Sequence, residues 1–74
     1  MSLEEYVKEK LWPVFVEAVH SLVMFHNHKT YTRDRILPEK PEITPMELAS
    51  RLNVSLGEAL VILYELKEES KSTP

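Results

Sequence analysis

The stretch ITPMELASRLNVSLGEALVILYEL, residues 43–66, predicts two helices joined by a tight turn. Thr44 can cap the first helix, because its hydroxyl can accept a hydrogen bond from a backbone N–H of the first turn. Pro45 suits the first helical position, where the N–H has no partner in any case. Glu47 completes a capping box three residues after Thr44. These local signals fix the start of the first helix of the pair.

The turn and the second helix carry signals of the same kind. Asn53 tolerates the left-handed backbone conformation that commonly ends a helix. Ser55 can cap the second helix, and Glu58, three residues later, gives a second capping box. We therefore expect a helix-turn-helix over residues 44–69.

The spacing L-A-x-x-L-N-V-S, which begins at Leu48, resembles the helix-turn-helix of winged-helix DNA-binding domains over about a third of the chain. In that family the second helix enters the major groove with polar or basic side chains. No wing is expected here, because residues 67–74 are too few. The outward positions of the second helix also carry no basic residue: Leu56, Gly57, Glu58, Leu60, Val61, Ile62 and Tyr64. The resemblance implies the helix-turn-helix fold of a DNA-binding domain without the polar and basic side chains that contact DNA. We therefore expect a module that binds protein.

Length, composition and charge narrow the class of protein. The 74 residues allow one small domain, placed at residues 1–70, with a frayed tail at 71–74. Cysteine is absent, which favours a cytoplasmic setting, and no apolar run is long enough to span a membrane. The net charge of −3 works against duplex DNA, whose binding depends on cations that neutralise phosphates.

A long N-terminal helix is expected over residues 3–26, where apolar residues follow helical spacing. Pro13 falls on the polar side of this helix, where a curved helix has its convex side, so we expect one bent helix. Packed on the wingless helix-turn-helix, it would complete a three-helix core in a mostly or all-α fold. A break at residues 10–12, with Pro13 in the first turn of a new helix, is the alternative.

Residues 28–43 form the predicted connector. Alternation over residues 30–37 allows a short strand, and one helical turn after Thr32 or plain coil are equally open. The connector also holds a basic cluster that could contact nucleic-acid backbone or stack on a base: Lys29, Tyr31, Arg33 and Arg35. A solvated loop that pairs with its acidic neighbours is the other interpretation of this cluster.

The first and last helices carry more apolar surface than one small core needs. Either the domain buries all of it, or the surplus is an interface for self-association or for a larger protein. We favour the interface, with these predicted partner-binding residues: Trp12, Leu60, Val61 and Tyr64.

Neither metal binding nor catalysis is expected. The spacing of His20, His26 and His28 matches no closed four-ligand zinc site, so these are predicted to be surface histidines. The single glycine, Gly57, lies in a predicted helix, so there is no phosphate-cradling glycine loop, and no nucleophile–base pair stands out. We therefore expect no cofactor and no enzymatic activity.

The functional expectation is a small accessory subunit that acts by protein contact within nucleic-acid machinery. In size, helicity, thermophile-like composition and acidic helix-turn-helix, the chain resembles the short helical accessory subunits of archaeal B-family DNA polymerases. That resemblance implies a larger polymerase partner whose fold the subunit stabilises. The alternative is a dimeric helix-turn-helix transcription regulator, with the first helix as the dimer seam and DNA contact through residues 29–35.

Overall fold

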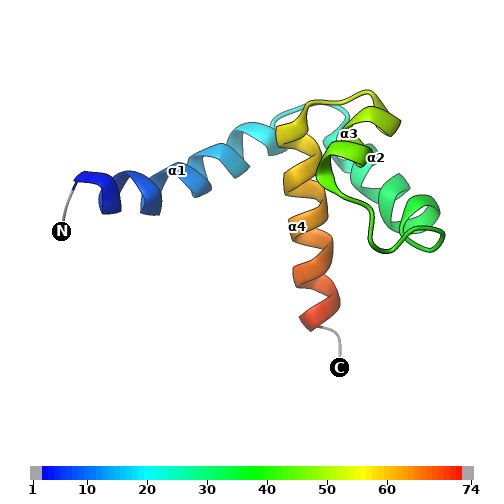
Figure 1. Cartoon of the computed structure of the whole chain (residues 1–74). Helices are drawn as coiled ribbons and strands as arrows, with labels where there is room; N and C mark the ends of the chain where they lie inside the picture. The colour runs from blue at the N-terminus through cyan, green and yellow to red at the C-terminus, as the bar shows by residue number, and fades with distance from the viewer. Residues whose placement is uncertain (1–2, 73–74) are drawn as a thin grey trace.

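The computed structural model describes residues 3–72, which fold into helices joined by short turns (Figure 1). No strand occurs within these described residues, so the predicted all-α class is confirmed. The elements in chain order are α1 (Leu3–His20), α2 (Phe25–Tyr31), the π-helix η1 (Thr32–Ile36), α3 (Pro45–Leu52) and α4 (Leu56–Ser72).

The start of α3 has the predicted capping box. The Thr44 hydroxyl accepts a hydrogen bond from the Glu47 backbone N–H, and the Glu47 carboxylate accepts one from the Thr44 N–H, each at 3.2 Å. Asn53 then ends α3 in the left-handed conformation, with φ 57° and ψ 47°. The Ser55 hydroxyl accepts a hydrogen bond from the Glu58 N–H at 3.0 Å and so caps α4. These local predictions hold because each depends on residues at most three positions apart.

The first helix is shorter than predicted. A helix over residues 3–26 is wrong, because α1 ends at His20 and a turn separates it from α2. Phe25, at 1% exposure, explains the turn: the chain must change direction after α1 to bring this ring into the core. Pro13 lies inside α1, so the alternative break at residues 10–12 does not occur.

The predicted connector at residues 28–43 begins later than expected, because its first residues belong to α2 and η1. Of the three conformations left open for residues 30–37, the helical turn after Thr32 is the one that forms, as the π-helix η1. The Thr32 hydroxyl donates a hydrogen bond to the His28 carbonyl, and the Leu37 N–H donates one to the Thr32 carbonyl. Thr32 and Ile36 are both fully buried. Their four-residue spacing puts them on one helical face, and burying that face outweighs the strand-like alternation.

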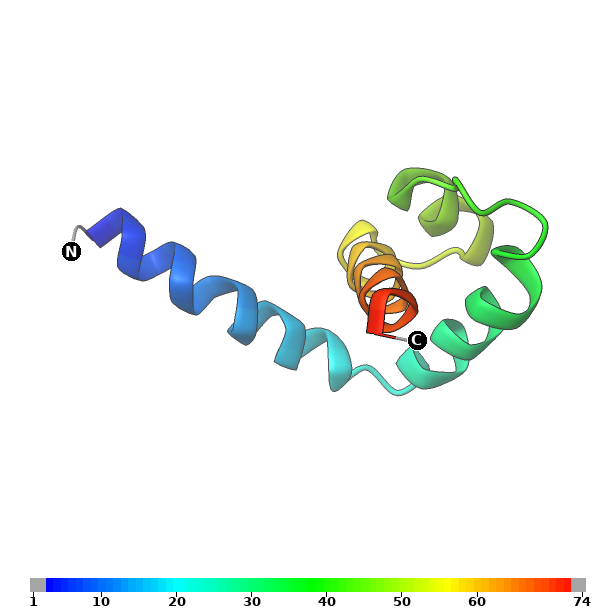
Figure 2. The same cartoon turned by 90° about the horizontal axis from the view of Figure 1, so that it is seen from below.

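Helices α2, α3 and α4 and the π-helix η1 form what we call the helical body, and α4 lies at its centre. Figure 2 shows it end-on, with α3 and α2 on different sides, and both helices contact it. α4 also extends to Ser72, beyond the predicted end at 69, so the predicted frayed tail at 71–74 begins too early; residues 73–74 lie outside the described residues. Every α-helix contributes to the buried core, which consists of Val19, Phe25, Ile36, Ile43, Leu48, Ala59, Val61, Ile62, Leu63 and Leu66.

Helix α1 stands out from this body. In Figures 1 and 2 its N-terminal half points away from the other helices. Val19, near its C-terminal end, is buried and Val16 is half-buried, whereas the side chains of Glu5 and residues 8–15 are exposed. The radius of gyration, 13.6 Å, accordingly exceeds the value of about 11 Å typical of a compact domain of this length.

Candidate protein-contact surface

Four large apolar side chains from α1 and α4 remain substantially exposed and form what we call the apolar platform: Trp12, Phe15, Leu60 and Tyr64. The Trp12 ring lies 5.3 Å from the Tyr64 ring, edge to face, and 5.7 Å from the Phe15 ring, measured between centroids. Such offset and edge-to-face arrangements are favourable for aromatic pairs. The platform is therefore an ordered aromatic surface rather than scattered exposed residues.

Gly57 explains how α1 approaches α4 at the platform. A Cβ atom at this position would lie 2.8 Å from Cζ of Phe15 and 3.2 Å from its Cε2. The first turn of α4 can accept the Phe15 ring only because no side chain occupies the space. Leu60 lies between Gly57 and Tyr64 on the same face of α4, so the platform continues along that helix.

The structure corrects one of the predicted partner-binding residues. Val61 was expected to be exposed, but it is fully buried. Helices α1, α2 and α3 all contact α4, so α4 is buried on more than the side that faces α3. Trp12, Leu60 and Tyr64 are exposed by 36%, 39% and 48%, as a contact role requires.

A second apolar feature lies on α1 beside the platform. Leu11 and Val14 are exposed by 59% and 61%, and Ala18, at the next helical step, is also exposed. We call these three residues the outer stripe of α1. A shallow hollow next to it is lined by Lys8, Leu11, Trp12 and Phe15.

Polar contacts between α2 and α4 hold the body together. The Glu58 carboxylate is buried and lies 2.6 Å from Nδ1 of His28, whose ring is partly exposed. Burying a carboxylate is unfavourable without such a partner. The predicted second capping box therefore keeps its Ser55–Glu58 half, while the Glu58 side chain turns towards α2.

Glu65 joins three helices. Its carboxylate is 2.6 Å from Nε2 of His20 at the end of α1, and it accepts a hydrogen bond from Nζ of Lys29 in α2 at 3.1 Å. Nζ of Lys29 also bonds Glu69. Burial alone would raise the pKa of Glu65, but the hydrogen bonds from His20 and Lys29 outweigh it and hold the pKa below the ordinary value. This cluster was not predicted from the sequence, although its signal is present there, as carboxylates on one face of α4 and basic residues around positions 20–29.

The predicted nucleic-acid cluster is only partly available to a ligand. Lys29 is bound by two carboxylates of α4. Nε of Arg33 lies 2.9 Å from Oδ1 of Asp34, and this hydrogen bond lowers the pKa of the Asp34 carboxyl. Tyr31 and Arg35 are exposed and line a hollow over α2 and η1. Contact of this cluster with nucleic acid stays a prediction.

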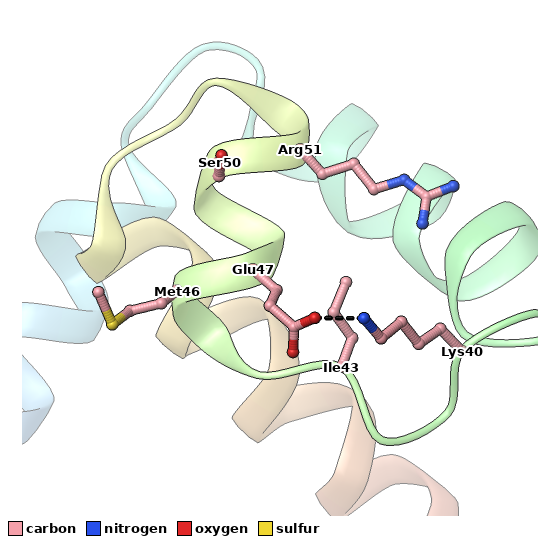
Figure 3. A pocket seen from close by; sticks show the side chains of 6 residues that line it. All are labelled: Lys40, Ile43, Met46, Glu47, Ser50 and Arg51. Atoms are coloured by element: carbon pink, nitrogen blue, oxygen red, sulfur yellow. Dashed lines mark hydrogen bonds and ion pairs between the residues drawn. The ribbon is translucent and has the colours of Figure 1, made fainter.

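A further hollow lies beside α3 and is shown in Figure 3: Lys40, Ile43, Met46, Glu47, Ser50 and Arg51 line it. The Lys40 ammonium group points into it and bonds the Glu47 carboxylate. The Arg51 guanidinium group is 3.8 Å from the Glu39 carboxylate. Because both cations lie next to carboxylates, the hollow carries little net positive charge for an anionic ligand.

Comparisons with known proteins identify no relative from which a role for the apolar platform could be taken. No family model matches the chain, and neither a curated protein nor a solved structure matches it. Among residues 3–72, no three histidine, cysteine or acidic side chains are grouped so that they could hold a metal ion. No helix in the same range is sufficiently long and apolar to cross a membrane.

Proposed function

We propose that this protein is a small, non-enzymatic helical accessory subunit that acts by protein–protein contact. The observation that carries the proposal is the apolar platform, which stays exposed although the body already has a filled core. Exposed aromatic clusters are enriched at protein interfaces, where Trp and Tyr supply much of the binding energy. Trp12, Leu60 and Tyr64 are the proposed docking residues.

The proposed setting is nucleic-acid machinery, such as a DNA polymerase holoenzyme, where the subunit would stabilise a larger partner. The α3–turn–α4 arrangement with its capped helix starts supports this setting through its resemblance to helix-turn-helix domains. On α4, the exposed face that would lie towards a DNA groove presents Leu60 and Tyr64. Side chains of this kind suit a protein surface better than phosphates.

Co-purification tests the proposal directly. The tagged full chain is used to capture partners from native lysate, and the variants Leu60→Ser and Tyr64→Ser are compared with it. Each variant should weaken partner binding by about 1–3 kcal/mol if its side chain is an interface hot spot. Met46→Ser is the matched control, because Met46 is 74% exposed and lies on α3, which contributes no residue to the platform, so binding should be unchanged. Undiminished capture by both platform variants would refute the proposed docking residues.

Duplex binding separates this proposal from the alternative of a dimeric transcription regulator. The isolated chain should not bind a random duplex below about 10 μM at ~0.15 M salt, because its charge is negative and Lys29 is already paired. Sub-micromolar binding that disappears in the double variant Arg33→Ala, Arg35→Ala would favour the regulator.

A further inference from the structure

We infer that a second copy of this chain covers the outer stripe of α1, in an antiparallel two-fold pairing of the two α1 helices. The outer stripe consists of Leu11, Val14 and Ala18. It shares no residue with the apolar platform, although Leu11 lines one hollow with Trp12 and Phe15. This pairing therefore goes beyond the proposed function and does not depend on it. It assigns a partner to exposed residues in the middle and the second half of α1.

The exposed area is the first argument. The chain exposes 5599 Å², whereas a compact protein of 8.6 kDa exposes about 4,700 Å². The excess of about 900 Å² is close to the roughly 800 Å² that each partner buries in a standard protein interface. Figures 1 and 2 show that the N-terminal half of α1 has no neighbour among the described helices.

The arrangement of side chains on α1 is the second argument. The outer stripe has spacings of three and four residues, which is the repeat of a helix–helix seam in a coiled coil. It is turned by roughly a third of the circumference from the face with Val16 and Val19 that packs on the body, at 100° per residue. A second helix can therefore lie along the stripe while α1 keeps its contact with α4.

Charge fixes the direction of the pairing. Lys10 and Glu17 flank the same edge of the stripe, seven residues apart. In an antiparallel pair that sets Leu11 opposite Val14 of the second copy, Lys10 of each copy faces Glu17 of the other, and symmetry forms this contact twice. A parallel pair would instead bring both helical bodies to the same end, because each body lies at the C-terminal end of its α1 (Figure 2). A self-complementary surface of this kind selects a second copy over an unrelated protein.

The first experiment measures the mass of the full chain by sedimentation equilibrium over a range of concentrations. We expect a dimer with about twice the 8.6 kDa of one chain. Val14→Glu should raise the dimer dissociation constant about a hundredfold or more, since a symmetric interface then buries two carboxylates. Val23→Glu is the matched control: Val23 is 95% exposed in the turn after α1, so the same substitution there should leave the dimer intact. Circular dichroism checks that both variants keep their helix content.

The second experiment tests the direction through charge reversal. Lys10→Glu or Glu17→Lys alone should weaken the dimer about tenfold, because each puts two like-charged pairs into the interface. The double variant should recover most of the affinity, since it restores both pairs with reversed signs. Lys67→Glu, on an exposed position of α4, controls for the change in net charge.

Three results would overturn the inference. A monomer at every concentration up to about 100 μM would remove the dimer itself. A dimer that tolerates Val14→Glu would have its interface elsewhere. A double variant that stays as weak as the single ones would contradict the antiparallel register. None of these results involves Leu60 or Tyr64, so failure here leaves the co-purification test of the platform intact.

Discussion

Val61 and Tyr64 lie one helical turn apart on α4, and their surroundings are opposite. Val61 is fully buried between α4 and its neighbours, while Tyr64 is 48% exposed and contacts Trp12 of α1. Both are large and apolar, so hydrophobicity alone does not distinguish a core residue from a contact residue. The difference comes from how α1, α2 and α3 pack on α4, and that depends on tertiary structure.

A matched pair of substitutions measures this difference. Val61→Ser should lower the free energy of unfolding by about 2–4 kcal/mol, because it leaves a cavity and buries a hydroxyl. Tyr64→Ser should cost under about 1 kcal/mol, since the lost contacts lie at the surface. Urea unfolding of both variants and of the unchanged chain provides the comparison. Equal destabilisation would show that Tyr64 belongs to the core, which would contradict its role in the platform.

At the scale of single elements, Pro13 tests how α1 is built. It lies inside the helix, where it removes one backbone hydrogen bond and crowds the carbonyl four residues earlier. Pro13→Ala should therefore increase helix content and keep or raise the midpoint of thermal unfolding. Pro45→Ala is the control: Pro45 occupies the first turn of α3, where proline is favourable, so its replacement should not raise the midpoint. A Pro13→Ala variant that melts earlier would contradict a continuous α1.

The elements also show what sequence can and cannot specify. The starts of α3 and α4 could be predicted because Thr44 and Ser55 bond backbone groups three residues away. The end of α1 could not, since it depends on the burial of Phe25 against residues distant in sequence. Residues 32–36 could not be decided from the sequence, since alternation and helical spacing are both present there. The burial of Thr32 and Ile36 on one face selects the helical alternative.

At the scale of the whole molecule, the candidate site was likewise predictable only in the features that do not depend on tertiary packing. The exposure of Trp12, Leu60 and Tyr64 was predictable, because the sequence holds more apolar surface than a small core can use. The burial of Val61 and the projection of α1 were not, because both depend on how complete helices pack. Lys29 shows the same dependence on packing. From the sequence it was expected in a basic surface cluster, whereas in the fold its ammonium group pairs with Glu65 and Glu69 and so links α2 to α4.

Glu65 connects this packing to pH, since it ties α1, α2 and α4 together through His20 and Lys29. Its folded-state pKa lies below the ordinary value of 4.5, so its stabilising contribution is fully present above pH 4.5 and is lost as the pH falls through the folded-state pKa. Lys29 behaves in the opposite sense. Burial would lower its pKa, but the hydrogen bonds to Glu69 and Glu65 outweigh this and hold the pKa above 10.5. Its contribution is therefore present below pH 10.5 and is lost as the pH rises through the folded-state pKa.

Glu65→Gln should consequently change the pH profile of stability at both ends. The variant should be less stable than the unchanged chain near neutral pH, and it should lose less stability on acidification below about pH 4.5. Its loss above about pH 10.5 should also be smaller, with the remaining part due to the Lys29–Glu69 pair. Urea unfolding at a series of pH values gives both slopes, and Glu42→Gln, at an exposed position, serves as the control. If Glu65→Gln only shifted the whole profile downwards without changing its slopes, the carboxylate would not be the titrating link among the three helices.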